Sequence, residues 1–310
     1  MNDRLIKGQF KGLDIAFVWA LTSRTAEEAV LRHDCDPAAA HLLSRGLTGA
    51  LLAAALLPDE NHRLTVSWQY PGALRRLVAD AGADGTVRAY IEPPHLSDTA
   101  DKNELYGDTG EVRVDRFAPD GHLLSSGTTP VGFHDIIEDL AYHFCISDQV
   151  ETAAAVMVGF KPDPEHPVDL CQGWLIQALP GCDLERFDRV RSRMHQADFR
   201  SLLARHGEAD EKGYFERIAA PLVEGEADFR GLHFEELPAP RFRCSCDHPD
   251  VLRAVAKSLP PDQRKEILDS GDPLVFRCRF CNARREIPAE ECRAIWEEES
   301  PGETEDGGEA

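Results

Sequence analysis

The most informative stretch of this chain is RFRCSCDHPDVLRAVAKSLPPDQRKEILDSGDPLVFRCRFCNARREIPAEECRAIW, residues 241–296, because it holds two closely spaced pairs of cysteines. The first pair is Cys244-x-Cys246 and the second is Cys278-x-x-Cys281. Each pair supplies two sulfur ligands from one turn, and four thiolates at one point match the tetrahedral Cys₄ coordination of Zn²⁺. The spacing therefore predicts a zinc site made by these four cysteines, rather than unliganded core thiols.

A module as small as residues 241–296 should depend on its metal. A core of this size supplies no more than about 5 kcal/mol, whereas zinc contributes about 10–16 kcal/mol of apparent folding free energy in small cysteine-rich modules. Oxidation removes zinc, because the thiolate is the metal ligand and a disulfide is a poor one. We therefore expect oxidation to unfold the module, which would make the site a redox switch. A purely structural zinc is the alternative interpretation.

Several neighbours of the four cysteines bear on this chemistry. Arginines crowd the site, and positive neighbours lower the pKa of a thiol and favour the reactive thiolate. They could equally offset the negative charge of a Zn–Cys₄ centre. Cys292 is either a resolving thiol or, as we favour, a partly buried structural thiol, and His248 is a minor competitor as a ligand. The arginines are Arg241, Arg243, Arg277, Arg279, Arg284 and Arg285.

Residues 1–182 predict an α+β core domain with a largely antiparallel sheet and packed helices, since strands follow one another without regular βαβ alternation. Asp36 suits an N-cap and is followed by Pro37, which predicts a helix over residues 37–57. A second helix is expected over residues 133–144, where apolar residues recur at helical spacing. Alternating or continuous apolar runs predict strands at residues 13–21, 64–68, 73–80, 86–91, 112–114, 151–160 and 170–178.

The rest of the chain divides into a linker, the zinc module and a tail. Residues 183–240 are rich in charge, with sparse apolar residues at helical spacing, and predict a helical linker region of amphipathic helices. The zinc-binding redox-switch domain follows over residues 241–296. Residues 297–310 hold many acids and no base, which predicts an acidic disordered tail.

Composition narrows the class of function. A formal net charge of −21 argues against nucleic acid and against anionic membranes as partners. The apolar stretch 37–57 is interrupted by His41 and Arg45 and is too short to span a bilayer, and the first residues show no secretory signal. We therefore expect a cytoplasmic chain, and in a reducing compartment the clustering of five of the nine cysteines indicates metal binding or redox chemistry rather than structural disulfides. No familiar catalytic motif is present, so we do not expect an enzyme.

The four-cysteine module resembles that of the heat-shock protein 33 family, the redox-regulated bacterial chaperones also called 33 kDa chaperonins. Upstream segments resemble the same family, so that the likeness covers nearly the whole chain. These segments are LTVSWQYPGALRRLVADAGADGTVRAYI (64–91), GFHDIIEDLAYHFCISDQVETAAAV (132–156) and GWLIQALPG (173–181). The chain departs from the family pattern in Cys292, in its other non-ligand cysteines and in its long acidic tail.

The resemblance implies a holdase chaperone that is inactive while reduced and bound to one zinc per chain. Oxidation would form the disulfides Cys244–Cys246 and Cys278–Cys281 and release the zinc. The zinc module and the linker would then unfold and expose apolar surface that holds unfolding client proteins without ATP. The resemblance also implies that activated chains form homodimers.

Two other functions remain open from the residues alone. A zinc-ribbon-like module could bind nucleic acid, but residues 241–296 carry nearly equal numbers of basic and acidic side chains, so the basic footprint is missing. A thiol-disulfide oxidoreductase could use Cys278-x-x-Cys281, but that motif normally sits in a βαβ context, which the sequence does not suggest.

Overall fold

The computed structural model describes residues 2–99, 101–204 and 213–299 of the chain. The chain divides into two compact units, Met1–Arg243 and Cys244–Ala310. The strands of the first unit are β1 (Arg4–Phe10), β2 (Ile15–Leu21), β3 (Arg63–Gln69), β4 (Arg76–Gly82), β5 (Thr86–Glu92), β6 (Glu111–Phe117), β7 (Leu123–Pro130), β8 (Thr152–Phe160), β9 (Val168–Ala178), β10 (Leu232–Leu237) and β11 (Arg241–Phe242). Its helices are α1 (Ser23–Arg32), α2 (Pro37–Ala54), α3 (Lys102–Tyr106), α4 (Ile136–His143), the π-helical turn η1 (Phe144–Asp148), α5 (Leu184–Met194), α6 (Ala197–Leu203) and α7 (Tyr214–Val223).

The strands of the first unit form two sheets. One has the order β10-β1-β2-β9-β8 and the other has the order β11-β5-β4-β3-β6-β7. Their pairings are antiparallel, apart from the short parallel pairing of β11 with β5. The predicted α+β fold with largely antiparallel strands is therefore confirmed, and the single sheet that the sequence suggested is two sheets.

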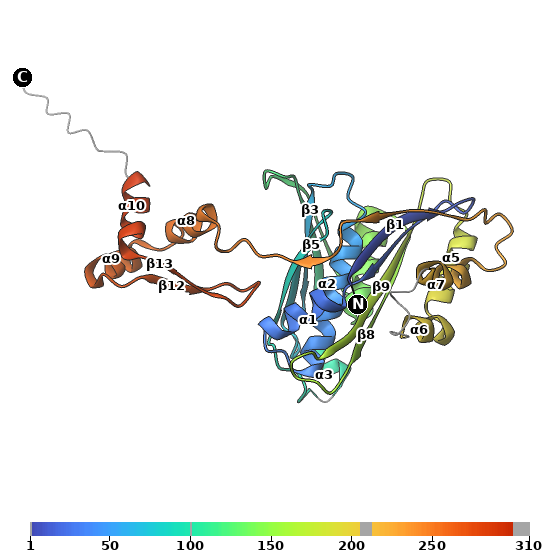
Figure 1. The fold of residues 1–310 in the computed structure, drawn as a ribbon, viewed down its shortest axis with the longest axis horizontal. Coiled ribbons are helices and arrows are strands. Elements are labelled where there is room, and N and C mark those ends of the chain that lie inside the picture. Colours follow the sequence, from blue (N-terminus) through green and yellow to red (C-terminus); the bar gives the residue numbers. More distant parts are fainter. Residues whose placement is uncertain (1, 100, 205–212, 300–310) are drawn as a thin grey trace, which may run out of the picture. The chain divides into compact units, whose positions relative to one another are not determined.

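Helix α2 packs between the two sheets (Figure 1). It begins as predicted, because the Asp36 side chain accepts a hydrogen bond of 2.8 Å from the backbone N–H of Ala39 and Pro37 needs no such partner. The helix is buried along nearly its whole length. Its leucines, among them Leu43 and Leu47, join the largest hydrophobic cluster with the inward faces of both sheets. This core holds the first unit together.

Helices α5, α6 and α7 cover the opposite face of the five-stranded sheet (Figure 1). The sequence predicted helices throughout this region, and the structure corrects its last part, where β10 pairs with β1. The residues of β10, LHFEEL, place apolar side chains at every second position over the first part of the strand, a period that suits a strand. The five-stranded sheet is thus buried on both faces.

The second unit is small. It contains α8 (Pro249–Lys257), α9 (Pro261–Ser270), the antiparallel hairpin of β12 (Leu274–Arg277) and β13 (Arg284–Ile287), and α10 (Ala289–Glu299). Its fully buried apolar core is the group Ala256, Ile287, Cys292, Ile295 and Trp296. The acidic tail was predicted to begin at residue 297, but α10 continues to Glu299, and residues 300–310 lie outside the described part of the chain.

The sequence also missed elements of the first unit. Strands β1 and β7 and helix α1 were not predicted. In β7 the residues LLSSGTTP are mostly exposed and lack apolar alternation, so that the usual strand signal is absent. In the described ranges, no helix has both the length and the apolar character needed to cross a membrane.

Candidate metal centre

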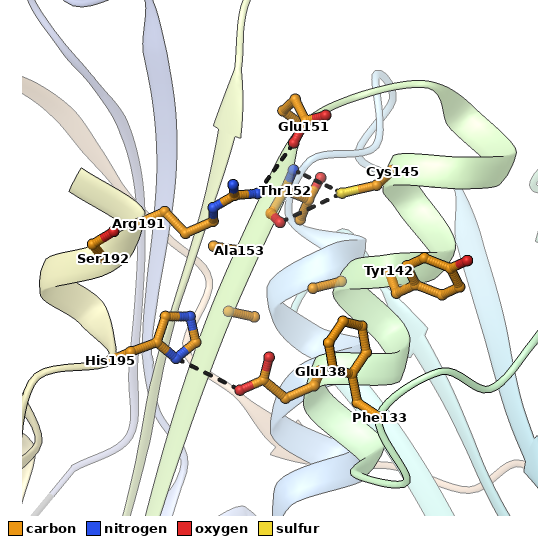
Figure 2. Close-up of a pocket in the computed structure, with 12 residues that line it drawn as sticks. Phe133, Glu138, Tyr142, Cys145, Glu151, Thr152, Ala153, Arg191, Ser192 and His195 are labelled. Atoms are coloured by element: carbon orange, nitrogen blue, oxygen red, sulfur yellow. Dashed lines mark hydrogen bonds and ion pairs between the residues drawn. The ribbon is translucent and has the colours of Figure 1, made fainter. Parts of the chain in front are cut away.

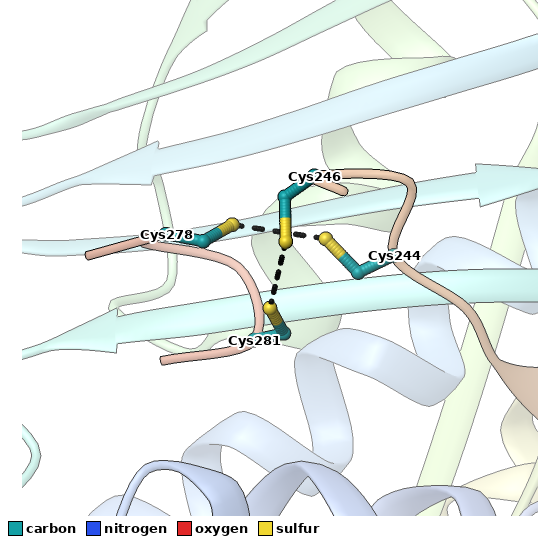
Figure 3. Close-up of side chains that lie close together, drawn as sticks. All are labelled: Cys244, Cys246, Cys278 and Cys281. Carbon is teal, nitrogen blue, oxygen red and sulfur yellow. Dashed lines mark hydrogen bonds between the residues drawn. The ribbon is translucent and has the colours of Figure 1, made fainter. Parts of the chain in front are cut away.

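Two turns bring the four predicted cysteines together (Figure 3). Cys244 and Cys246 lie in the segment that leads into α8. Cys278 and Cys281 lie in the turn that joins β12 to β13. There the N–H of Cys278 donates to the carbonyl of Ala283 at 2.9 Å, and Asn282 donates back to the carbonyl of Cys278 at 2.8 Å. These bonds fold the second pair into a compact loop that points both sulfurs the same way.

The spacing of the sulfurs fits a tetrahedral metal ion. All four Sγ atoms lie within 4.8 Å of one another. The Sγ atoms of Cys244 and Cys278 are 3.7 Å apart, and those of Cys246 and Cys281 are 3.4 Å apart. A zinc–sulfur bond of about 2.3 Å in a regular tetrahedron requires sulfurs about 3.8 Å apart. The donor set and the spacing therefore suit Zn²⁺, and the four thiols are free of disulfides.

The four sulfurs do not have the same surroundings. Cys246 and Cys281 are buried, whereas Cys244 and Cys278 are half-buried. The Nε–H of Arg285 donates to Sγ of Cys246 at 3.3 Å, and the same guanidinium lies 3.4 Å from the carboxylate of Asp247. Burial disfavours the thiolate of Cys246, but hydrogen bonds from Arg285 and the neighbouring thiols outweigh burial and lower its pKa. Burial raises the pKa of Cys281.

Of the arginines that the sequence placed near the cysteines, not all contact the sulfurs, and several pair elsewhere. Arg285 contacts a ligand sulfur, whereas Arg277 bonds to Asn282 at 3.2 Å and Arg284 pairs with Glu286. Arg241 belongs to the first unit, where it pairs with Asp84 at 3.2 Å. His248 is the N-cap of α8, and its Nδ1 accepts a hydrogen bond from the backbone N–H of Asp250. The His248 side chain therefore caps that helix, and it does not belong to the cluster of four sulfurs.

Burial shifts the pKa of each of the remaining five cysteines in the same direction. Burial raises the pKa of Cys171 to about 11 and that of Cys35 to about 12. Burial likewise raises the pKa of Cys145, Cys182 and Cys292. Such thiols are poor nucleophiles, because the thiolate is the reactive form. Cys292 is fully buried in the core of the second unit, which fits the structural role that we favoured for it.

A buried glutamine joins the five-stranded sheet to the helices that cover it, and the sequence patterns did not single it out. The side-chain oxygen of Gln172, in β9, accepts a bond of 3.0 Å from the indole of Trp19. Its amide group donates to the carbonyl of Leu203 at 2.6 Å and to the hydroxyl of Tyr214 at 2.8 Å. A polar residue inside the apolar run LCQGWLIQA was the available signal, because buried amides need partners.

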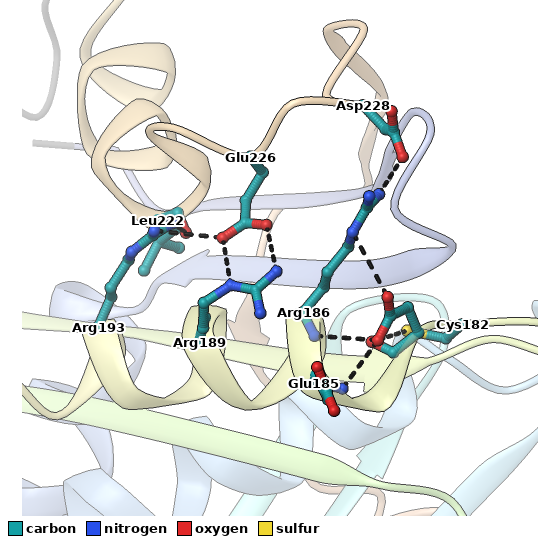
Figure 4. Close-up of polar contacts among 9 residues, drawn as sticks. Cys182, Glu185, Arg186, Arg189, Arg193, Leu222, Glu226 and Asp228 are labelled. Atoms are coloured by element: carbon teal, nitrogen blue, oxygen red, sulfur yellow. Dashed lines mark hydrogen bonds and ion pairs between the residues drawn. The ribbon is translucent and has the colours of Figure 1, made fainter.

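A glutamate fastens the same helices to each other (Figure 4). The carboxylate of Glu226 accepts two hydrogen bonds from Arg189, of 3.1 and 3.0 Å, and one of 3.2 Å from Arg193. Both arginines belong to α5, while Glu226 follows α7. The hydrogen bonds from Arg189 are the main reason that the pKa of Glu226 is lowered. Charge pairing at this point ties α5 to the segment after α7.

Comparison with known proteins gives the family. A profile of the family described as Hsp33 protein matches residues 3–288. The chain belongs to the Hsp33 family. A 33 kDa chaperonin of Thermus thermophilus is 33% identical over 301 residues, covering 94% of this chain and 86% of the relative. A 33 kDa chaperonin of Clostridium botulinum (strain Langeland) is 30% identical over 290 residues, covering 91% and 93%.

A solved structure shows the same fold as the Hsp33 chain described here. The crystal structure of the 33 kDa chaperonin (heat shock protein 33 homolog) of Thermotoga maritima aligns with a TM-score of 0.77, over 97% of this chain and 100% of that one. The two sequences are 22% identical in this alignment, so that the likeness concerns the fold. The curated relatives are named chaperonins, and membership of their family supports a chaperone function for this chain.

Proposed function

We propose that this protein is a redox-regulated holdase chaperone of the cytoplasm, and that it is not an enzyme. In the resting form, Cys244, Cys246, Cys278 and Cys281 hold one Zn²⁺, and client binding is off. The observation that carries the proposal is the convergence of four free thiols in the small second unit of an Hsp33-family chain. When bound, zinc supplies a cross-link between two distant segments, and the fold of the unit depends on that link.

Oxidation would remove this link. Formation of each disulfide removes two electrons from a pair of zinc-bound thiolates. One molecule of hydrogen peroxide accepts them, together with two protons from the solvent, and becomes two molecules of water. We propose the pairs Cys244–Cys246 and Cys278–Cys281, which join cysteines of the same segment. Such disulfides cannot ligate zinc, so the ion is lost and nothing replaces its cross-link. Two equivalents of peroxide are therefore needed for each chain.

The alternative pairing would have the opposite effect on the fold. The shortest separations between sulfurs run between segments, from Cys244 to Cys278 and from Cys246 to Cys281. Disulfides along these lines would release zinc and yet keep the two segments tied, because they would cross-link the same positions. A switch that unfolds the unit therefore requires pairing within each segment. Mapping the disulfides by mass spectrometry distinguishes the two outcomes.

Loss of the zinc domain (residues 241–296) and of the linker region (residues 183–240) would expose the surface that binds clients. The helices of the linker cover an aromatic face of the core domain, residues 1–182. In that layer Phe215 stacks on Trp174, with ring centroids 5.4 Å apart and planes at 8°. Phe17 and Trp19 lie beside the Phe215 ring at 5.6 and 5.7 Å. Unfolding polypeptides bind such apolar surface, and activated chains would associate as homodimers. Neither nucleic acid nor membrane takes part.

Zinc release measured together with chaperone activity tests the proposal. Reduced protein is treated with peroxide at elevated temperature, while a chromogenic chelator reports zinc and light scattering reports aggregation of a thermally unfolded client enzyme. We expect about one zinc per chain to leave as suppression of aggregation appears. A matched variant, Cys292→Ala, keeps all four proposed ligands, adds no polar group to the buried core and should behave like the parent. Oxidised protein that loses zinc and still lets the client aggregate would contradict the proposal.

A further inference from the structure

The outer edge of β8 has backbone groups that no other strand satisfies. β8 is the last strand of the five-stranded sheet and pairs with β9 on its inner side. At Thr152 the N–H and the carbonyl point away from β9, where Sγ of Cys145 lies 3.3 and 3.6 Å from them. In an antiparallel strand the outward direction recurs every second residue. The N–H and carbonyl groups of Ala154, Val156 and Val158 therefore point outward as well.

Across the described ranges, no hydrogen bond joins these outward groups of Ala154, Val156 and Val158 to another element. The space beside Ala154 and Val156 is a groove, which we call the β8 groove. Two cavities that share Glu138 and Ala154 make it up, one of about 410 Å³ along residues 151–154 and one of about 280 Å³ along residues 154–157. Residues of α4 and α2 line it on one side and residues of α5 and α6 on the other. Figure 2 shows the part between α4 and α5.

The sequence of this edge strand lacks the features by which proteins usually protect an outer strand. Exposed edges tend to carry charges or proline, or to be very short, because an open edge pairs with other chains. The other outer strands of the first unit follow that rule: β10 carries His233, Glu235 and Glu236, β7 ends in Pro130, and β11 has two residues. The sequence of β8, TAAAVMVGF, contains neither a charged residue nor a proline. Its one irregularity is a bulge at Gly159 and Phe160, beyond the groove.

We propose that the β8 groove binds an extended segment of a non-native polypeptide, which adds to the sheet as a strand beside β8. The inference rests on the proposed chaperone function and names how a client is held. Pairs of N–H and carbonyl groups repeating every second residue are matched by another extended backbone. Recognition through the backbone accepts almost any sequence, which suits a protein that must bind many clients.

Most charges of the resting groove are paired with each other, and Arg200 is a further cation on its wall. Arg45 bonds to Asp135 at 2.8 Å and Arg191 to Glu151 at 3.2 Å. A third contact, 3.6 Å from Nδ1 of His195 to the carboxylate of Glu138, crosses the groove from α5 to α4 (Figure 2). A strand can settle on the edge only when this contact opens. His195 follows α5, in the region that detaches in the proposed mechanism, so the edge is restricted at rest and free after activation.

Hydrogen exchange on the full-length, peroxide-oxidised protein tests the inference. The probe is reduced and carboxymethylated α-lactalbumin, a polypeptide that stays unfolded in native buffer. We expect the amides of Ala154, Val156 and Val158 to exchange at least tenfold more slowly when the probe is bound. The alternate amides, at residues 153, 155 and 157, already bond to β9 and should change little.

A pair of variants isolates the backbone contribution. Val156→Pro removes the outward N–H at the centre of the groove, a position where an edge strand tolerates proline. Val156→Ala shortens the same side chain and keeps the N–H. Both variants are first checked for native circular dichroism and thermal unfolding. We expect Val156→Pro to bind the probe at least fivefold more weakly than Val156→Ala.

The outcomes separate this inference from the proposed function. Probe binding without slower exchange at these three amides, or equal affinity of the two folded variants, overturns the inference and leaves the holdase in place. Failure of the oxidised parent to bind the probe overturns both. Slower exchange that rises with protein concentration and needs no probe would assign the edge to a second copy of this chain, and would likewise overturn the inference.

Discussion

The two units of this protein are stabilised in different ways. In the first unit, two large hydrophobic clusters lie on the two faces of the five-stranded sheet, and α2 is buried along nearly its full length. In the second unit, five buried residues form the core, and α9 has no buried residue at all. What the second unit has instead is a set of four convergent thiols.

This difference indicates which unit an oxidant can destabilise. Hydrophobic burial responds weakly to oxidants, because it is spread over many side chains and none of them is indispensable. A metal link concentrates about 10–16 kcal/mol in four sulfur atoms, and oxidation of those atoms removes it at once. Oxidation is therefore expected to unfold the small second unit, whose own core is weak. The large first unit, with its extensive core, is expected to stay folded.

Removal of zinc should produce the largest difference in stability between the two units. With a strong chelator in reducing buffer, we expect residues 244–299 to lose their protection from hydrogen exchange, because about 10 kcal/mol of stabilisation disappears. Helix α2 and strand β9 should keep theirs, because they are buried in the first unit. Exchange measured by mass spectrometry checks both regions in one sample. Persistent protection of α8 and α10 without metal would mean that their own core suffices.

The next largest effect is expected within the first unit. Gln172→Leu should leave the carbonyl of Leu203, the hydroxyl of Tyr214 and the indole of Trp19 without their partner, at about 1–3 kcal/mol for each buried group left unpaired. The covering helices should then exchange faster and the reduced protein should suppress some aggregation. Gln177→Leu is the matched control, since Gln177 lies in the same strand and bonds to Thr152. Equal effects of the two variants would remove the special role of Gln172.

A smaller, pH-dependent effect is expected at Glu226. Hydrogen bonds from Arg189 lead the causes that lower the pKa of Glu226 below its ordinary value of 4.5. A lowered pKa in the folded state adds stability above pH 4.5, and this stability is lost as pH falls through the folded-state value. Glu226→Gln should therefore lower the melting temperature of the covering helices at pH 7, and the difference from the parent should shrink as the pH falls below 4.5. A difference that is constant with pH would contradict this assignment.

The smallest effect is expected at Arg285. Its hydrogen bond withdraws electron density from Sγ of Cys246, so that Arg285→Ala should speed peroxide-driven zinc release by a few-fold, the scale of one bond worth about 1 kcal/mol. Arg284→Ala is the control, because Arg284 pairs with Glu286 and not with a ligand. Stopped-flow detection of zinc with a chromogenic chelator gives both rates. Slower release from Arg285→Ala would mean that the guanidinium activates the sulfur instead.

Much of the fold and of the candidate metal site could be predicted from local sequence patterns. The spacing of Cys244, Cys246, Cys278 and Cys281 predicted a cluster that the structure brings together, and Asp36 with Pro37 predicted the start of α2. Strand β10 was missed because it lies among helix-forming residues and is defined by its pairing with β1. The bonds of Gln172 and Glu226 were missed for the same reason, since their partners are 31 to 153 residues away or on another helix.

The turn that carries Cys278 and Cys281 also bears on how quickly the protein would return to the reduced, zinc-bound form that we propose. Helices α8 and α9 separate this turn from the first cysteine pair, so that the open chain must close a loop to rebuild the site. Short loops close in about 10–100 ns, and closure slows only gradually with length, whereas disulfide exchange takes seconds to hours. The chain search is therefore never the slow step. In the proposed mechanism, the supply of reductant would therefore set the duration of the active state, and the chain would stay active after the oxidant has gone.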